Sequence, residues 1–218
     1  MFQKILIANR GEIAVRIIRA CREMGIKTVA VYSEADRDAL HTLLADEAIC
    51  IGPAPSTESY LDMERILTAC VVMKADAIHP GFGFLSENAR FAELCEKCNI
   101  RFIGPSAEII NKMGNKSEAR KTMMAAGVPV VPGSKEPVYT VEEGLKTAKE
   151  VGFPVMIKAS SGGGGKGMRV SRSEEDFEAN FLNAQMESVK GFSDNTMYIE
   201  RFVENPRHIE FQILGDRY

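Results

Sequence analysis

The feature that most constrains this chain is one segment, Pro154 to Val170, which reads PVMIKASSGGGGKGMRV. It joins a short apolar strand, a lysine at the end of that strand, four consecutive glycines and a second lysine. Ordering such a loop is entropically unfavourable, because glycine loses more backbone freedom on folding than any other residue. Folded proteins keep such loops mainly where backbone N–H groups must approach a ligand closely, and phosphate is the commonest such ligand. The segment therefore predicts a nucleoside triphosphate site.

The loop matches neither of the two best-known phosphate-binding patterns. Gly165-Lys166 is followed by Gly167 rather than by serine or threonine, and the spacing is also wrong for G-x-G-x-x-G opening a helix. Residues 168–172 alternate apolar and polar side chains, which is the period of a strand with one buried face. We therefore expect a hairpin that folds over phosphates as a flap. The alternative is a flexible surface hairpin without a ligand, but Lys158 ends an otherwise apolar strand, where a charge is rarely placed without a role.

Length and charge narrow the class of protein. The chain has 218 residues, enough for one large or two smaller domains, and 27 basic against 30 acidic residues give a net charge of −3. This balance provides no general attraction for nucleic acid or an anionic membrane. No apolar run approaches the ~20 residues of a membrane span, and the first residues lack the pattern of a signal peptide. We expect a soluble cytoplasmic protein.

The cysteines do not form a recognisable framework. They are odd in number and scattered, at Cys21, Cys50, Cys70, Cys95 and Cys98. The last two form a C-x-x-C pair, but the pair lies in a helical pattern with no second pair and no nearby histidine. We expect buried or half-buried free thiols rather than a disulfide, metal or redox site.

The first half of the chain alternates strand and helix patterns. Strands are expected at 4–8, 27–32, 47–51, 76–79 and 101–104, and helices at 12–24, 60–72 and 89–98. This rhythm is typical of an open parallel sheet covered on both faces, with binding loops at the carboxyl ends of its strands, here 9–11, 33–36 and 79–87. Only Gly11 is present where a dinucleotide site needs three spaced glycines. We expect a Rossmann-type scaffold without its usual cofactor, and a structural hydrogen-bonding role for His79; His41 has no role that can be argued.

The second half continues the α/β pattern after a stiff connector. A helix at 118–126 is stopped by Gly127, and the proline-containing segment 128–132 reads as a hinge. Further helices are expected at 141–151 and 174–187, and further strands at 197–203 and 208–214. No later element covers the last of these strands, and an unpaired edge strand is an aggregation hazard. We therefore expect the chain to be the front part of something longer.

Eight blocks, in order and over nearly the whole chain, resemble the amino-terminal half of a biotin carboxylase, a member of the ATP-grasp superfamily, of the kind found in bacterial acetyl-CoA carboxylase. The blocks are KILIANRGEIAVRIIRA (4–20), YSEADRDALH (32–41), LADEAICIGPAPSTESYL (44–61), IHPGFGFLSEN (78–88), FIGPS (102–106), MGNKSEAR (113–120), KASSGGGGKGMRV (158–170) and ENPRHIEFQIL (204–214). The glycine loop alone is a weak signal, whereas the combined set is very specific.

The resemblance implies an α/β fold in four parts. Residues 1–113 match a Rossmann-like, parallel-sheet amino-terminal (pre-ATP-grasp) domain, and 114–132 a helical linker or hinge. Residues 133–203 match the ATP-grasp lid subdomain. Residues 204–218 match the start, with its first strand, of a truncated carboxyl-terminal ATP-grasp domain.

The resemblance also implies which residues face the phosphates of ATP. Lys116 and Lys158 match the two lysines that contact phosphate, and Gly164 and Gly165 lie in the flap that closes over the triphosphate. Taken alone, Lys116 reads as an ordinary solvated lysine at a helix start, so its role depends on the match. The Mg²⁺ ligands, the bicarbonate-binding residues and the catalytic arginine of the family all fall beyond Tyr218, and no catalytic residue is expected within the chain.

At the other end of the nucleotide, Glu200 matches the acidic residue at the adenine edge, and His208 a histidine lining the pocket. Arg201, Phe202 and Val203 match the linker that pairs with the base through its backbone. Without the match, Glu200 and His208 would read as ordinary strand side chains.

A loop of the first half matches the side where biotin and bicarbonate meet. Its candidate residues are Phe82, Gly83 and Glu87. Phe82 stands where the family often has tyrosine, which removes a hydroxyl group and any hydrogen bond that it would make at that position.

The family chemistry has two steps: ATP phosphorylates bicarbonate to carboxyphosphate, whose breakdown delivers CO₂ to biotin. The implied partners are a biotin carboxyl carrier protein, carboxyltransferase subunits and, in the complete enzyme, a second copy in a homodimer. The final acceptor, acetyl-CoA, propionyl-CoA or pyruvate, is left open.

Two other functions remain possible for the sequence: another ATP-grasp ligase of the carbamoyl-phosphate or purine-pathway type, and a non-catalytic assembly module. We expect residues 1–218 alone to be inactive and to bind ATP weakly or not at all.

Overall fold

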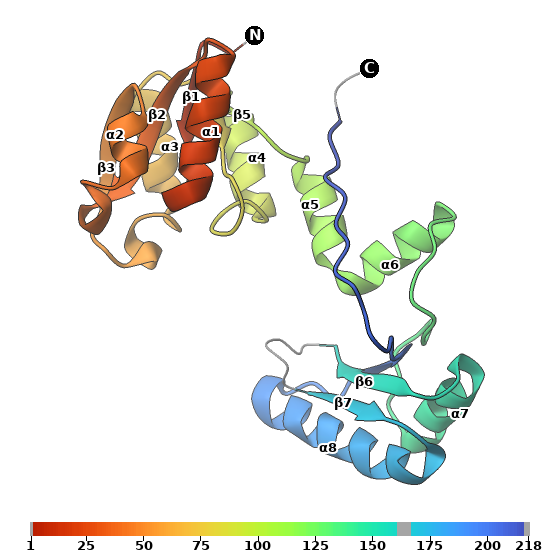
Figure 1. The fold of residues 1–218 in the computed structure, drawn as a ribbon. Helices are drawn as coiled ribbons and strands as arrows, with labels where there is room; N and C mark the ends of the chain where they lie inside the picture. The colour runs from red at the N-terminus through yellow and green to blue at the C-terminus, as the bar shows by residue number, and fades with distance from the viewer. Residues whose placement is uncertain (1, 161–166, 216–218) are drawn as a thin grey trace. The chain divides into compact units, whose positions relative to one another are not determined.

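The computed structural model describes residues 2–160 and 167–215. The chain divides into two compact units, Met1–Gly127 and Val128–Tyr218 (Figure 1). Each unit has its own sheet and its own hydrophobic core.

Five strands form the sheet of the first unit: β1 (Lys4–Ile7), β2 (Lys27–Ser33), β3 (Glu47–Gly52), β4 (Ala77–His79) and β5 (Arg101–Phe102). Their spatial order is β3-β2-β1-β4-β5, and every neighbouring pair is parallel. The predicted open parallel sheet is therefore confirmed. Because the chain first builds outward from β1 through β2 and β3 and then crosses back to β4, the sheet has a switch point between β1 and β4, where such folds bind ligands.

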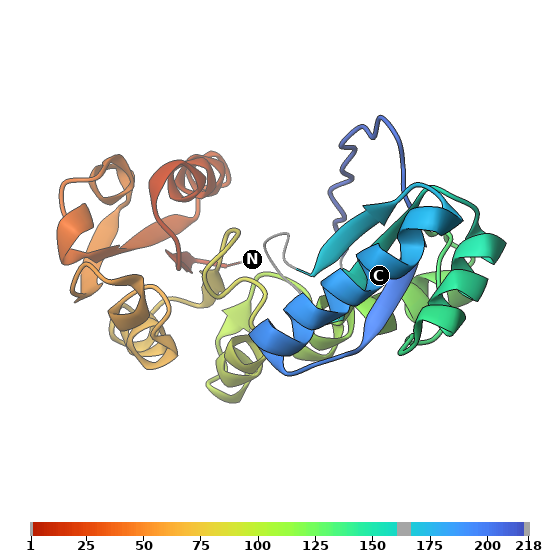
Figure 2. The same cartoon turned by 90° about the horizontal axis from the view of Figure 1, so that it is seen from below.

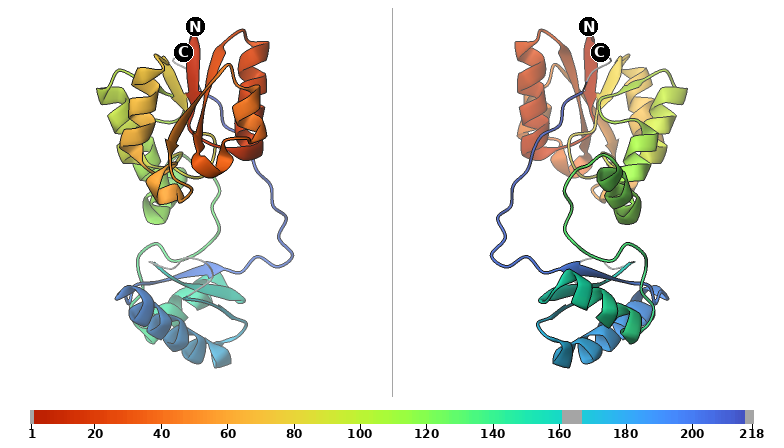
Figure 3. Two further views of the ribbon diagram at one scale, coloured as in Figure 1. Left: turned by 90° about the vertical axis from the view of Figure 1, so that its left-hand side faces the viewer. Right: turned by 90° about the vertical axis from the view of Figure 1, so that its right-hand side faces the viewer.

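Helices cover both faces of this sheet (Figure 3). They are α1 (Gly11–Glu23), α2 (Leu40–Leu44), α3 (Met63–Val72) and α4 (Ala89–Lys97), with short 3₁₀ turns η1 (Glu34–Asp36) and η2 (Ser56–Glu58). Successive β1 side chains point to opposite faces: Ile5 and Ile7 join the core cluster that contains α1, whereas Leu6 joins the cluster that contains α3 and α4. This explains why β1 is apolar at every position inside the sheet.

Two further helices, α5 (Ala107–Gly114) and α6 (Lys116–Ala125), complete the first unit. The second corresponds to the predicted helix at 118–126. The first was not predicted, although its start carries a local signal: Ser106 caps it by accepting a hydrogen bond from the Ile109 N–H at 3.4 Å.

The second unit has a three-stranded antiparallel sheet of order β7-β6-β8, formed by β6 (Val155–Ala159), β7 (Met168–Ser171) and β8 (Met197–Arg201). The strands of the predicted hairpin are confirmed, with Lys158 opposite Met168. Helices α7 (Val141–Val151) and α8 (Glu174–Phe192) lie on one side of the sheet (Figure 2). Their core includes Phe177 and Phe181, both fully buried.

One predicted element is wrong. Residues 208–214 form no strand, although their apolar side chains alternate as in one. Ile209, Phe211 and Ile213 are 65%, 82% and 81% exposed, and no described residue pairs with their backbone in a ladder. Alternation alone does not make a strand, because the backbone groups also need a neighbouring strand to bond.

Two smaller expectations can also be compared with the structure. All five cysteines are free, and of the C-x-x-C pair Cys95 is buried as expected, whereas Cys98 is exposed, contrary to expectation. Within residues 2–160 and 167–215, no helix combines the length and the apolar character needed to cross a bilayer.

Candidate functional site

The sheet of the second unit has one covered and one open face. Residues paired across antiparallel strands point to the same side, so the pairing of β6 with β7 and β8 assigns each side chain to a face. The face toward α7 and α8 is buried and carries Val155, Ile157 and Ile199. The other face, which we call the open face, consists of Met156, Lys158, Met168, Val170, Tyr198 and Glu200, all partly or fully exposed.

Lys158 and Glu200 form an ion pair on the open face, between Nζ and Oε2. They lie on adjacent strands at diagonal positions, since Met156 is opposite Glu200 and Lys158 is opposite Tyr198. Their side chains are 37% and 29% exposed, so the pair is reachable from solvent. The two residues assigned to opposite ends of the nucleotide are thus in direct contact.

The outer edge of β8 is covered by the segment 132–134, which we call the connector. The Ser134 N–H donates to the Ile199 carbonyl at 2.7 Å, and the Arg201 N–H donates to the Pro132 carbonyl at 2.7 Å. Gly133 allows this approach, because a Cβ there would lie 2.5 Å from the Ile199 carbonyl oxygen. The connector therefore protects an edge strand that would otherwise be open to pairing.

Three candidate residues lie at the carboxyl end of β8. The Arg201 side chain donates to the Val151 carbonyl at 3.1 Å and so fastens the strand to α7. Phe202, through its N–H, donates to the Pro154 carbonyl at 2.9 Å. Val203 is 49% exposed, and its N–H donates to no atom of the described chain. This last group is available to a ligand.

The stem of the glycine hairpin is fastened to α8. Glu187 bonds the Arg169 guanidinium through one carboxylate oxygen and accepts the Gly167 N–H at 3.2 Å through the other. These contacts hold the pKa of Glu187 below its usual value, chiefly through the Gly167 N–H. Gly167 has φ +67°, and a Cβ there would lie 2.8 Å from that of Ala159. Glycine is therefore required where the chain re-enters the sheet.

The remaining predicted nucleotide residues are less constrained. Gly164 and Gly165 lie outside the described residues. Lys116 is the first residue of α6, in the other unit from Lys158. His208 lies in the extended tail, where its ring contacts Glu210 at 3.3 Å and its side chain is 88% exposed. Among the predicted set, the described structure thus brings together Lys158 and Glu200.

The switch point of the first unit is built around Asn9, which follows β1. Its buried amide donates to the carbonyls of Pro80 and Phe82, each at 2.7 Å, and so ties the loop after β4 to the end of β1. Gly81 lies so close that a Cβ there would be 2.8 Å from the Asn9 amide nitrogen. His79 accepts the Gly81 N–H at 3.1 Å, consistent with its predicted structural role.

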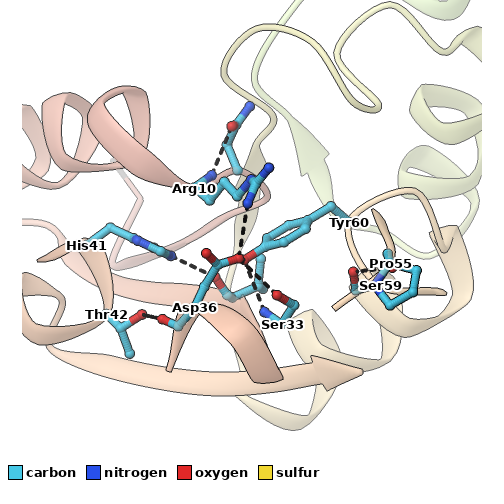
Figure 4. Close-up of polar contacts among 10 residues, drawn as sticks. Arg10, Ser33, Asp36, His41, Thr42, Pro55, Ser59 and Tyr60 are labelled. Carbon is cyan, nitrogen blue, oxygen red and sulfur yellow. Dashed lines mark hydrogen bonds and ion pairs between the residues drawn. The ribbon is translucent and has the colours of Figure 1, made fainter. Parts of the chain in front are cut away.

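Next to this loop lies a polar network that the sequence analysis did not identify (Figure 4). Asp36 accepts hydrogen bonds from the Tyr60 hydroxyl at 2.6 Å and from the Ser33 hydroxyl at 2.9 Å, and pairs with the Arg10 guanidinium at 3.5 Å. Arg10 in turn lies over the rings of Tyr60 and Phe84, which stack on each other with centroids 5.0 Å apart. We call these residues the Asp36 network.

Contacts in the Asp36 network change the pKa values of Asp36 and Tyr60, and burial changes the pKa of the neighbouring His41. Burial by itself would raise the pKa of Asp36, but the bonds from Tyr60 and Ser33 and the charge of Arg10 lower it below the ordinary value. Burial and the bond to Asp36 raise the pKa of the Tyr60 phenol. His41, which is buried, bonds the Val31 carbonyl at 3.2 Å, and burial lowers the pKa of its ring.

Acid destabilisation of the first unit is expected to depend on Asp36. Since its folded pKa lies below the unfolded value of about 3.9, the carboxylate stabilises the fold at neutral pH, and this contribution disappears as pH falls through the folded pKa. Asp36→Asn should lower the free energy of unfolding by about 1–2 kcal/mol at pH 7 and by less at pH 3. Urea titrations at both pH values measure this. Asp38→Asn, an exposed carboxylate two residues away, should have little effect at either pH, and equal losses at both pH values in Asp36→Asn would contradict the assignment.

The loop candidates border an open cavity of about 400 Å³ in the first unit. It is lined by Asn9, Arg10, Gly11, Glu12, Ile13, Phe82, Gly83 and Phe84. Phe82 is 61% exposed, and Glu87 is exposed but lies outside the lining. Two of the three candidates therefore share a cavity at the switch point with a guanidinium group.

Comparison with known proteins decides the family. Residues 1–110 match the family model described as "Biotin carboxylase, N-terminal domain". The chain belongs to the biotin carboxylase family. Residues 115–218 match a second model, "Carbamoyl-phosphate synthase L chain, ATP binding domain". The resemblance inferred from the sequence blocks is confirmed.

Relatives of this biotin carboxylase chain match it from end to end. Biotin carboxylase 1 of Bacillus subtilis is 57% identical over 218 residues, which are 100% of this chain and 48% of the relative. A Campylobacter jejuni biotin carboxylase, solved as a β,γ-ATP complex, is 53% identical with a TM-score of 0.82, over 95% of this chain and 46% of that one. The biotin carboxylase domain of Hydrogenobacter thermophilus 2-oxoglutarate carboxylase is 50% identical with a TM-score of 0.78, over 94% of this chain and 45% of that one. This chain thus spans about half the length of the relatives it matches.

Proposed function

We propose that the open face of the β6–β8 sheet binds ATP, with Lys158 at the phosphates, Glu200 at the adenine edge, and Arg201, Phe202 and Val203 presenting backbone groups to the base. The Lys158–Glu200 ion pair carries this proposal. A triphosphate has several negative charges where Glu200 has one, so the half-exposed ammonium group can exchange its partner on binding. The N–H of Val203, a residue that is 49% exposed, adds a donor for the ring edge.

The rest of the open face suits a planar base. Met156, Met168 and Val170 offer apolar surface around the two charges, and pockets for small ligands combine such surface with a few fixed polar groups. The Campylobacter jejuni relative was solved with a β,γ-ATP ligand, and the Hydrogenobacter thermophilus domain with MgADP, ADP and bicarbonate. Lys116, Gly164, Gly165 and His208 are assigned to the same nucleotide by their match to the family blocks alone.

The proposed reaction of the complete protein is the carboxylation of biotin. ATP and bicarbonate form carboxyphosphate, with ADP leaving, and the carboxyl group passes to a ureido nitrogen of biotin as phosphate is released. Phosphoryl transfer depends on positioning and charge neutralisation, for which Lys158 and the hairpin backbone are suited. The loop with Phe82, Gly83 and Glu87 is assigned to the biotin and bicarbonate side.

The family reaction also uses Mg²⁺. Within residues 2–160 and 167–215, no group of three or more His, Cys, Asp or Glu side chains could hold a metal ion. On this proposal the metal ligands come from residues outside the 218, and so do the bicarbonate-binding residues and the catalytic arginine. Residues 1–218 alone are expected to lack turnover and to bind ATP weakly or not at all.

The partners follow from the same proposal. A biotin carboxyl carrier protein presents the biotin, carboxyltransferase subunits use the product, and the complete enzyme is a homodimer in the cytoplasm. The acceptor is proposed to be acetyl-CoA, which would place the protein in fatty-acid synthesis. Pyruvate and propionyl-CoA remain alternatives, and the Hydrogenobacter thermophilus relative serves a 2-oxoglutarate carboxylase.

A second candidate rests on the model matched by residues 115–218, which takes its name from carbamoyl-phosphate synthase. The two functions differ in their need for biotin. The protein made from the complete reading frame should release phosphate from ATP when bicarbonate and free biotin are both present. Phosphate release that needs bicarbonate and an ammonia donor, and is indifferent to biotin, would favour the second candidate.

A further inference from the structure

We infer that Asp36 and Tyr60 are positioning residues for the biotin-side loop: they hold the Arg10 guanidinium against Phe84 and thereby fix residues 80–84 at the switch point. The inference rests on the proposed function for its kinetic consequence. Its structural part concerns only residues 9–84 of the first unit, all of which the structure describes.

The loop needs external support because its backbone is strained. Gly81 and Gly83 have φ +64° and +70°, and Phe84 has φ +42°. The left-handed region is accessible to glycine but unfavourable for a phenylalanine, which persists there only when its surroundings hold it. Local hydrogen bonds fix the first part of the loop, from Asn9 to the carbonyls of Pro80 and Phe82.

Phe84 is held through its ring. The ring stacks on Tyr60 at an interplanar angle of 16°, and the Arg10 guanidinium carbon lies 5.8 Å from its centroid and 5.6 Å from that of Tyr60. A planar cation over two parallel rings is a favourable arrangement that lysine reproduces poorly. The Arg10 guanidinium therefore holds Phe84 in its strained backbone conformation.

Asp36 holds the Arg10 guanidinium in place. It is the anion paired with Arg10, and its own position is set by the hydroxyls of Ser33 and Tyr60, while the Tyr60 oxygen also accepts the Ser33 N–H at 3.0 Å. Tyr60 thus contributes twice, with its ring under Arg10 and its hydroxyl on Asp36. Arg10, Phe82, Gly83 and Phe84 all line the cavity of about 400 Å³, so loosening Asp36 alters the wall of this cavity without removing a group from it.

The test combines backbone exchange with kinetics. In residues 1–218, Asp36→Asn and Tyr60→Phe should each raise hydrogen–deuterium exchange in peptides covering 79–88 by about tenfold, while peptides covering α7 and α8 stay unchanged. In the protein from the complete reading frame, both variants should raise the KM for free biotin about tenfold, because a loop that is no longer held in its binding conformation must be ordered when biotin binds. The KM for ATP and kcat should stay within about twofold. Asp38→Asn is the matched control for the lost carboxylate.

The possible outcomes distinguish a failure of the positioning role from a failure of the proposed function. If both variants match Asp38→Asn in exchange and in biotin KM, or if the KM values for ATP and biotin rise together, the positioning role is refuted. Tyr60→Phe keeps the stacked ring, so it decides the matter if Asp36→Asn does not fold. If the unaltered protein shows no biotin-dependent phosphate release, the proposed function fails instead, and the exchange rates alone still decide whether Asp36 holds the loop.

Discussion

Replacing Lys158 with methionine should reduce the apparent affinity of the complete protein for ATP by about 10–100-fold. A charge-assisted contact contributes about 1.5–3 kcal/mol, which corresponds to this range. Methionine keeps much of the length and apolar surface of the lysine stem, so the packing of Met156 and Tyr198 around it should change little. Nucleotide titration followed by calorimetry measures the effect directly, without the need for turnover.

The control for this substitution is Lys146→Met. Lys146 is an exposed lysine on α7, so it undergoes the same change of charge away from the open face, and its ATP affinity should stay within about twofold of the unaltered protein. Glu200→Gln separates the two members of the ion pair, because it frees Lys158 while keeping a hydrogen-bonding group at the adenine edge. Equal losses in the Lys158 and Lys146 variants would mean that only net charge matters.

Phe181→Ala should strongly destabilise the second unit and leave the stability of the first unchanged. Phe181 is fully buried and stacks on Phe177 with centroids 5.9 Å apart. Truncating a buried phenylalanine destabilises a domain by about 3–5 kcal/mol, against total stabilities of about 5–15 kcal/mol. Among the described residues, each hydrophobic core consists of side chains from one unit alone. Exchange protection should therefore fall in β6, β8 and α8 and be kept in β1, β2 and α1.

Leu182→Ala provides the matched comparison. It changes the next residue of α8, which is 42% exposed, and should lower the stability of the second unit by less than about 1 kcal/mol. Simultaneous loss of protection in both units of the Phe181 variant would contradict the division of the chain into independently stable cores.

Local patterns were enough to predict most of the elements. In the first half, apolar runs of strand length alternate with helical periodicity, and Gly25 marks the end of α1. The position of Lys158 at the end of an apolar strand identified it as a candidate. The same reasoning failed at 208–214, where alternation was present and a neighbouring strand was not.

The contacts that define the two sites could not be predicted in this way. Glu200 contacts Lys158, 42 residues away in the sequence, because β8 pairs with β6 rather than with β7. Local periodicity identifies strands but does not predict the order in which they pair. The Asp36 network joins residues from the ends of β1 and β2 and from the loop before α3. A usable signal did exist, since two of the binding loops expected at strand ends, 9–11 and 33–36, contain Arg10 and Asp36.

The most direct test of the central claim is a methyl NMR titration of the complete protein, labelled at methionine methyl groups, with a non-hydrolysable ATP analogue. Met156 and Met168 lie on the open face, whereas Met186 is an exposed residue of α8 and Met63 belongs to α3. We predict that the first two methyl signals shift with a single saturable affinity that Lys158→Met weakens, and that the other two stay in place. Saturable binding that leaves Met156 and Met168 unshifted would place the nucleotide elsewhere and contradict the account.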